Sequence, residues 1–223
     1  FMMHQLEESN TTTIWLHDLS TGETKPLTYP DAVGCFDAMP TWSPDDRQVA
    51  FGSNRGGDNN LYIVSVSDGR IRKVTQGLDA GPWDIHPTWS PDGKSIAYGN
   101  VEENNRDIFI YKLTDESVEQ LTTDPGTDER PRWSPDGRYL AFVSDREKDQ
   151  DIWLLELSTR ALQRIDIDLK KIRTFNWSPD GMWFVIDGQK EGSNYGPNCW
   201  IVRSSGGLAQ AVCFPDVSTD RGG

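Results

Sequence analysis

The chain has 223 residues and a formal net charge of −13 at pH 7. This acidic balance argues against a surface for nucleic acids or anionic membranes, because both require patches of Lys and Arg. Three cysteines are too few for a disulfide framework, and no apolar run approaches the ~20 residues of a membrane-spanning helix.

One five-residue motif recurs four times along the chain. Its copies are Trp42-Ser43-Pro44-Asp45-Asp46, Trp89-Ser90-Pro91-Asp92-Gly93, Trp133-Ser134-Pro135-Asp136-Gly137 and Trp177-Ser178-Pro179-Asp180-Gly181. Successive tryptophans are 47, 44 and 44 residues apart. Repetition at this period predicts an all-β fold, a β-propeller whose four-stranded antiparallel sheets form blades.

The repeat of Trp89 shows the expected order of strands. A short first strand ends at the tryptophan, and the Pro-Asp-Gly turn after it reverses the chain. A second strand follows at Ile96-Ala97-Tyr98, with the period-two alternation typical of β-structure. The third strand covers Ile108-Phe109-Ile110-Tyr111, and the fourth covers Glu119-Gln120-Leu121-Thr122.

The pattern extends beyond the four motifs at both ends of the chain. At the N-terminus, Met2-Met3-His4 matches a second strand, so the first repeat lacks its innermost strand. The predicted blades cover residues 1–29, 38–76, 85–123, 129–166 and 173–214 of a single domain over residues 1–223. Nineteen strands are therefore predicted, one short of five complete blades. They form either a five-bladed ring with its closing strand absent or supplied by a neighbouring copy, or part of a larger ring.

These repeats resemble those of TolB-like β-propellers, from Met2 to Phe214. The resemblance rests on the Trp-Ser-Pro-Asp-Gly motif, on Ile-Ala followed by an aromatic residue, on Asp-Ile-aromatic as in Asp107-Ile108-Phe109, and on Leu121-Thr122. It implies one of several roles: a periplasmic or extracellular binding protein, as in the Tol system, where the module holds a peptidoglycan-associated lipoprotein; a gating domain of a prolyl-oligopeptidase-like serine hydrolase; or a polysaccharide lyase. The fold does not choose among these roles.

A catalytic centre is not predicted. The sequence has no Gly-x-Ser-x-Gly motif, and its three histidines are scattered. No Cys/His spacing fits a zinc site, and too few histidines converge for a metal-dependent lyase. We therefore expect a non-enzymatic domain without a firm cofactor.

Acidic residues recur five positions before three of the tryptophans, at Asp37, Asp84 and Asp128. Because the innermost strands of a propeller line its channel, these carboxylates are expected to ring one channel mouth, with His86 and Glu129 nearby. The ring is a candidate site for a cationic group or for Ca²⁺, which prefers oxygen ligands. The alternative is that each carboxylate caps the amides of its own loop.

Two other sets of residues have structural interpretations. The repeated Asp45, Asp92, Asp136 and Asp180 are expected to stabilise the hairpin turns. Cys199 and Cys213 are predicted on adjacent strands, where a disulfide could form only with a three-residue turn between the strands.

The function predicted from the sequence is a non-catalytic binding scaffold for a protein or peptide partner, with the channel mouth and face loops as the binding surface. Its location is expected to be periplasmic or extracellular. The alternatives are an accessory domain of a prolyl-oligopeptidase-like hydrolase and a propeller that self-assembles by strand exchange.

Overall fold

The computed structural model describes residues 2–8, 11–29, 33–81, 84–102, 105–190 and 199–212. Within these ranges the fold is all-β, with nineteen strands and no helix. This confirms the predicted fold class. The strands are β1 (Met2–Glu8), β2 (Thr11–His17), β3 (Thr24–Pro26), β4 (Asp37–Trp42), β5 (Gln48–Ser53), β6 (Asn60–Ser65), β7 (Ile71–Lys73), β8 (Thr88–Trp89), β9 (Ser95–Glu102), β10 (Asn105–Lys112), β11 (Val118–Gln120), β12 (Asp128–Trp133), β13 (Tyr139–Glu147), β14 (Asp149–Glu156), β15 (Leu162–Ile165), β16 (Lys171–Trp177), β17 (Trp183–Gln189), β18 (Cys199–Arg203) and β19 (Gln210–Ala211).

Each sheet is a meander of strands that are consecutive in the chain. The strand orders are β1-β2-β3, β4-β5-β6-β7, β8-β9-β10-β11, β12-β13-β14-β15 and β16-β17-β18-β19. The first sheet has only three strands, because β1 takes the place of a second strand. The chain divides into two compact units, unit 1 (Phe1–Trp133) and unit 2 (Ser134–Gly223).

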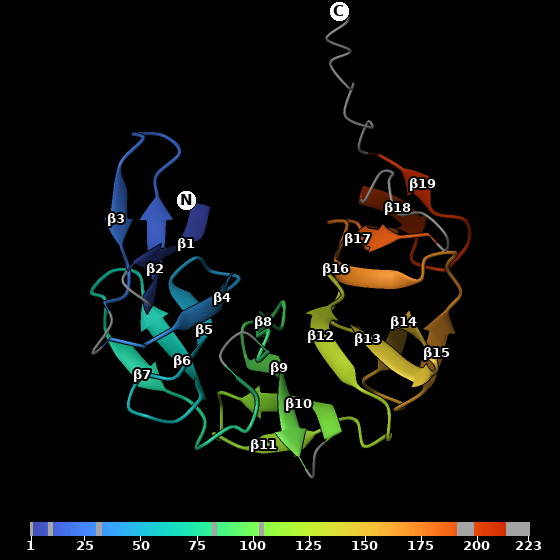
Figure 1. The fold of residues 1–223 in the computed structure, drawn as a ribbon, viewed down its shortest axis with the longest axis horizontal. Coiled ribbons are helices and arrows are strands. Elements are labelled where there is room, and N and C mark those ends of the chain that lie inside the picture. Colours follow the sequence, from blue (N-terminus) through green and yellow to red (C-terminus); the bar gives the residue numbers. More distant parts are fainter. Residues whose placement is uncertain are drawn as a thin grey trace, which may run out of the picture. The chain divides into compact units, whose positions relative to one another are not determined.

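In unit 1, the sheets lie side by side through their first strands. β4 contacts β8, and β8 contacts β12. Figure 1 shows β4 and β8 on the inner side of this unit and β3, β7 and β11 on its outer side. The residues at the starts of β4, β8 and β12 are thereby brought to one side of the unit.

The core lies between neighbouring sheets and depends on the second strands. Small alanines occupy the middle of three of them, and Ala50, Ala97 and Ala141 are fully buried. The aromatic residue after each alanine is also buried: Phe51, Tyr98 and Phe142. Small and large side chains thus alternate where two sheets approach closely. In the last sheet Val185 replaces alanine and is 43% exposed.

The Ser-Pro-Asp-Gly turns share one set of hydrogen bonds. In the turn after β8, Asp92 Oδ1 accepts hydrogen bonds from Ser90 Oγ (2.6 Å) and from the backbone N of Lys94 (3.0 Å). Ser90 Oγ accepts one from the backbone N of Ser95 (2.9 Å). The same bonds recur around Asp45, Asp136 and Asp180. A serine and an aspartate two positions apart therefore hold each hairpin closed.

The threonine that recurs at the fourth strand, after Leu27, Val74 or Leu121, also has a structural function. The threonine hydroxyl accepts a hydrogen bond from a buried backbone amide of the third strand. Thr28 pairs with Ile14 (3.0 Å), Thr75 with Leu61 (2.9 Å) and Thr122 with Ile108 (3.0 Å). These threonines are almost completely buried. Each one fixes the outer strand to the strand before it.

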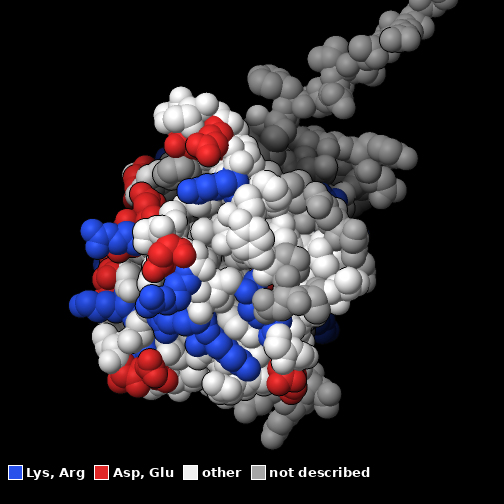
Figure 2. Space-filling model, turned by 90° about the vertical axis from the view of Figure 1, so that its left-hand side faces the viewer, with Lys and Arg blue, Asp and Glu red and all other residues white. Residues whose placement is uncertain are grey.

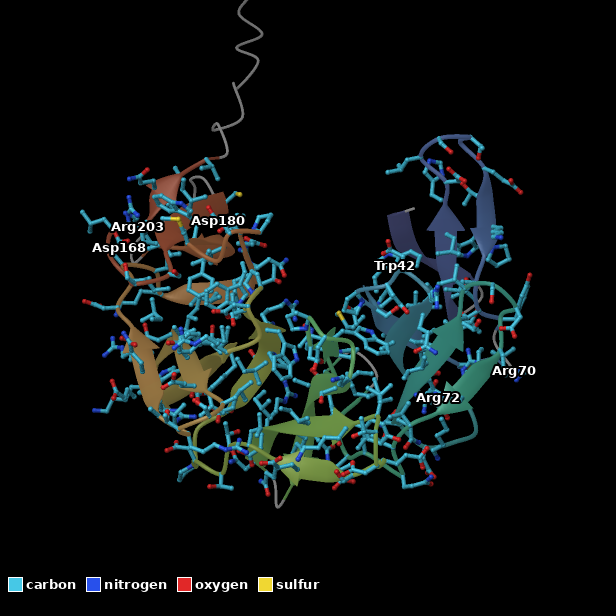
Figure 3. All side chains as sticks on the ribbon, turned by 180° about the vertical axis from the view of Figure 1, so that it is seen from behind. Trp42, Arg70, Arg72, Asp168, Asp180 and Arg203 are labelled. Carbon is cyan, nitrogen blue, oxygen red and sulfur yellow. The ribbon has the colours of Figure 1, made fainter. Side chains whose placement is uncertain are left out.

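Basic residues follow the outer edge of unit 1. Figure 2 shows Lys and Arg gathered on the side where β3 and β7 lie, although the chain is acidic overall. Arg70 and Arg72, labelled in Figure 3, precede and occupy the outer strand β7 and are exposed. Charged side chains on an edge strand discourage pairing with another molecule's strand.

Candidate functional site

The five predicted channel-mouth residues all lie in unit 1, at or just before the first strands. Asp37 begins β4 and Asp128 begins β12, while Asp84 and His86 precede β8. Asp37 and Asp128 are fully buried, and Glu129 is 7% exposed. No group of three or more His, Cys, Asp or Glu side chains within the described ranges is arranged to hold a metal ion.

Asp37 is held in a buried ion pair. Arg55 Nη2 lies 2.6 Å from Asp37 Oδ2, and Ser53 Oγ donates a hydrogen bond to Oδ1 at 2.7 Å. The Arg55 guanidinium lies over the rings of Phe51 and Tyr62, at 5.4 and 5.6 Å from their centroids. Both oxygens of Asp37 are thus occupied, and the carboxylate is not an open ligand for Ca²⁺.

Asp84 occupies the same repeat position in a different environment. Its side chain is 42% exposed, and Oδ1 lies 3.3 Å from Arg106 Nη1. The same nitrogen lies 2.9 Å from Glu129 Oε2, and Glu129 also pairs with Arg130. Two of the predicted acidic residues are therefore bridged by one arginine. The carboxylates at this end of unit 1 are largely compensated by positive charge.

His86 lies within this arginine cluster. Burial, together with the positive charges of Arg132, Arg130 and Arg106, lowers its pKa to about 3. Burial also lowers the pKa of Arg132 to about 10, so Arg132 keeps its charge at neutral pH. The His86 imidazole is consequently neutral there. It can exchange hydrogen bonds with a ligand but cannot contribute a positive charge.

Three repeats share an unusual backbone feature three residues before the motif tryptophan. Met39, His86 and Arg130 occupy this position in successive repeats and have positive φ angles of 51°, 42° and 56°. The β4–β5 register shifts between Ala38 and Thr41, which is a β-bulge. Left-handed backbone is rare for residues other than glycine, and bulges redirect side chains. Three consecutive repeats therefore use a strained backbone at the same place.

Ser53 and Arg55 together form a clamp on the buried Asp37 carboxylate. The sequence carries a signal for this clamp. Ser53 and Arg55 follow Asp37 by 16 and 18 positions, and Ser144 and Arg146 follow Asp128 by the same offsets. The corresponding residues after Asp84 are Asn100 and Glu102. The Ser-x-Arg triplet thus accompanies the two fully buried aspartates, Asp37 and Asp128, and is absent after the exposed Asp84. Nothing comparable in the sequence indicates Arg106.

The motif tryptophans pack between neighbouring repeats. Trp89 is 7% exposed, and its Nε1 donates a hydrogen bond to the carbonyl oxygen of Thr41 (3.3 Å) in the preceding repeat. Trp42 and Trp177 pack against the apolar clusters of their units, and Trp133 is partly buried. Trp177 also contacts Phe184, with ring centroids 4.4 Å apart.

The proposed cysteine pair is only partly within the described ranges. β18 and β19 pair Trp200 with Ala211, and the backbone N of Val212 donates to the carbonyl of Cys199 (3.0 Å). This register places Val212 opposite Cys199. Cys213 lies outside the described residues, so the disulfide stays a prediction. Cys35 is buried, with a free thiol.

Two family models together cover most of the sequence. The model described as "TolB beta propeller domain" matches residues 83–221. The model described as "Dipeptidyl peptidase IV (DPP IV) N-terminal region" matches residues 3–83. The first match alone covers more than half of the chain.

Three known proteins illustrate the similarity. TolB from Acinetobacter baumannii aligns with a TM-score of 0.77 and 24% identity, over 89% of this chain and 48% of that one. A putative TolB from Agrobacterium tumefaciens aligns with a TM-score of 0.76 and 22% identity, over 93% of this chain and 75% of that one. The "Uncharacterized peptidase YuxL" of Bacillus subtilis (strain 168) is 39% identical over 64 residues, which are 28% of this chain and 9% of the peptidase.

This chain therefore spans about half of the A. baumannii TolB chain and a small part of the peptidase. The structural likenesses, all under 25% identical, describe the fold. Within the described residues, no helix is long and apolar enough to cross a membrane.

Proposed function

Because this chain belongs to the TolB β-propeller domain family, we propose that it is a non-catalytic binding domain that holds a segment of a partner protein. The binding surface is the inner side of unit 1, around Asp84, His86 and Glu129 with their arginines. A periplasmic or extracellular location is part of the same proposal.

The observation that carries this proposal is the left-handed backbone at Met39, His86 and Arg130. Such a conformation costs on the order of 1 kcal/mol or more for a residue with a side chain, and glycine would avoid that cost. Strained non-glycine residues concentrate at sites where the side chain is used. A thioether, a neutral imidazole and a guanidinium at the same position of successive repeats suit a polypeptide, which offers both apolar and polar groups.

Replacing these three side chains by glycine tests the proposal directly. A library of random dodecapeptides displayed on phage is selected on the immobilised wild-type chain and, in parallel, on the variant Met39→Gly, His86→Gly, Arg130→Gly. We expect a consensus peptide to be enriched on the wild-type chain and to bind the variant at least tenfold more weakly. Glycine relieves the backbone strain but gives the unfolded chain more freedom, so the thermal midpoint of the variant is expected to change little.

The matched control changes charge at a distant place. Arg70→Ala, Arg72→Ala removes two exposed arginines at the outer strand β7 and should leave peptide binding unchanged. The proposal is wrong if no consensus is enriched on the wild-type chain, or if the glycine variant binds the consensus peptide as tightly as the wild type does.

The similarity to a peptidase supports a second candidate function. In it, this propeller is the accessory domain of a serine hydrolase of the prolyl-oligopeptidase type. The supporting observations are the 39% identity with the B. subtilis peptidase and the match of residues 3–83 to the dipeptidyl peptidase region. Sequencing the complete coding region tests it. A downstream Gly-x-Ser-x-Gly segment would support this role, and a stop codon shortly after Gly223 would exclude it.

A further inference from the structure

A notch lies between the hairpin turns of consecutive repeats in each unit. In unit 1 it has a volume of about 320 Å³ and lies between the Ser43–Asp45 and Pro91–Gly93 turns, with Trp89 in its wall. In unit 2 it has a volume of about 540 Å³ and lies between the Ser134–Asp136 and Pro179–Gly181 turns, with Trp177 in its wall. The two notches occupy equivalent places in the repeat.

The two repeats differ at one equivalent position beside the turn glycine. Ser204 in unit 2 corresponds to Leu113 in unit 1, because each donates its backbone N–H to the residue just after the turn glycine, Met182 or Lys94. Leu113 packs against the apolar cluster that contains Trp89. Ser204 is small, donates its hydroxyl to the carbonyl of Gly181 (2.9 Å) and lines the notch.

The wall of the larger notch is also more aromatic. Tyr139 lines it at the position that Gln48 occupies in the smaller notch. Together with Trp177, Leu154, Pro135 and Pro179, it gives the notch an apolar wall. The volume is large enough for a long side chain and part of the backbone that carries it.

Two carboxylates stand at this wall. Oδ1 of Asp136 accepts the hydroxyl of Ser134, and Oδ1 of Asp180 accepts that of Ser178. Within the described part of the chain, no hydrogen bond or ion pair reaches Oδ2 of either residue. These hydrogen bonds lower the pKa of both carboxyl groups, so both are ionised at neutral pH. Asp180 is labelled in the last blade in Figure 3.

We propose that the notch lined by Trp177, Tyr139, Asp136 and Asp180 binds an arginine side chain of a partner polypeptide. The aliphatic stem would lie against the apolar wall, and the guanidinium would meet the free carboxylate oxygens. A planar guanidinium suits both contacts, because it stacks on aromatic rings and pairs with carboxylates. The net charge of −13 favours the approach of a basic segment. This inference shares with the proposed function only the idea of a polypeptide partner, and it uses none of the unit 1 residues on which that proposal rests.

The experiment uses the whole chain and three tripeptide probes. Ac-Gly-Arg-Gly-NH2, its citrulline analogue and Ac-Gly-Pro-Gly-NH2 are titrated into ¹⁵N-labelled protein, and the indole N–H signal of Trp177 is followed by NMR. Citrulline has nearly the shape of arginine without its charge. We expect saturable shifts with the arginine peptide and affinity lower by about tenfold or more for the citrulline peptide.

Two variants remove the site in different ways. Ser204→Leu places a larger apolar side chain in the wall of the notch, and Asp136→Asn with Asp180→Asn removes the charge while keeping an oxygen acceptor for each turn. Both should weaken binding of the arginine peptide by about tenfold or more. The matched control, Asp45→Asn with Asp92→Asn, makes the same charge change at the smaller notch and should leave the affinity unchanged. Should Ser204→Leu fail to fold, the asparagine pair still tests the site.

Three outcomes would overturn the inference. Equal binding of the citrulline peptide would show that the charge is not recognised. Tighter binding of the proline peptide would make the notch a site for extended proline-containing segments instead. An equal loss in the control pair would attribute binding to the overall field of the protein. Failure here leaves the inner-strand proposal intact, because the phage selection depends on other residues.

Discussion

Asp37 and Asp84 occupy the same repeat position but differ in their burial and in the way their carboxylates are paired. The carboxylate of Asp37 is fully buried and paired with Arg55, whose side chain is only 7% exposed. The Asp84 carboxylate is 42% exposed and lies beside Arg106, which also forms an ion pair with Glu129. A repeat position thus fixes the backbone location of a residue, while residues elsewhere in the repeat decide its environment.

The difference separates structural carboxylates from accessible ones. A clamp made by Ser53 and Arg55 turns Asp37 into a part of the core. Without the equivalent serine and arginine, Asp84 remains at the surface among His86 and the arginines. The binding surface that we propose for unit 1 is therefore centred on the repeat in which the clamp is missing.

The largest expected effect comes from breaking the Asp37–Arg55 pair. Asp37→Asn leaves the Arg55 guanidinium buried without its counter-charge, and removal of one partner of a buried ion pair typically costs about 3–5 kcal/mol. We expect a marked fall in the urea midpoint of the first unfolding transition that involves unit 1, measured by tryptophan fluorescence.

The matched variant is Asp84→Asn. Its ion pair with Arg106 is largely solvated, so the expected cost is less than about 1 kcal/mol. Similar urea midpoints for the two variants would contradict the distinction between a buried and an exposed aspartate.

The next effect depends on pH and comes from His86. Its pKa is about 3 in the folded chain and about 6.5 in the unfolded one. As the pH falls below 6.5, the unfolded state therefore takes up a proton that the folded state does not, and stability is lost progressively toward pH 3. Between pH 6.5 and pH 5 this loss amounts to up to about 2 kcal/mol.

His86→Asn isolates this contribution. Asparagine tolerates the left-handed backbone and does not titrate. We expect its unfolding free energy to fall less steeply than that of the wild type between pH 6.5 and pH 5, in urea titrations at matched ionic strength. Parallel pH curves for the two proteins would show that His86 is accessible to protonation in the folded state.

The contrast between Asp37 and Asp84 also explains how much of the fold and the site could be predicted from the sequence alone. The β-propeller repeat was predictable, because the Ser90–Asp92 pair and Thr122 act through hydrogen bonds that recur at fixed offsets in other repeats. The site was only partly predictable. Asp84 and His86 were identified from their position in the repeat. Arg106 was not, because it lies on β10, about 20 residues further along the chain, and no sequence motif links it to Asp84.

A smaller effect is expected from the turns. Asp92→Ala removes the acceptor for Ser90 Oγ and for the Lys94 amide. Because this turn is solvent-exposed, the expected loss is about 0.5–1 kcal/mol. The measurement is the thermal midpoint by circular dichroism, with Asp92→Asn as a control that keeps the acceptor. A larger loss for the asparagine variant than for the alanine variant would argue against this hydrogen-bond role.

The smallest expected effect compares two turns that differ at one position. Asp46 has a φ of 59° where the next turn has Gly93 with a φ of 69°. Asp46→Gly relieves about 1 kcal/mol of left-handed strain but gives the unfolded chain more freedom, so a net gain of about 0.5 kcal/mol is expected. Gly93→Asp is the reverse change and should destabilise the fold by a similar amount. A Cβ at Gly93 would lie 3.8 Å from Pro44 Cδ, an ordinary van der Waals contact, so the pair of variants isolates the backbone conformation. Thermal midpoints that move in opposite directions would confirm it, and midpoints that fall in both variants would show that Asp46 contributes a contact beyond its backbone.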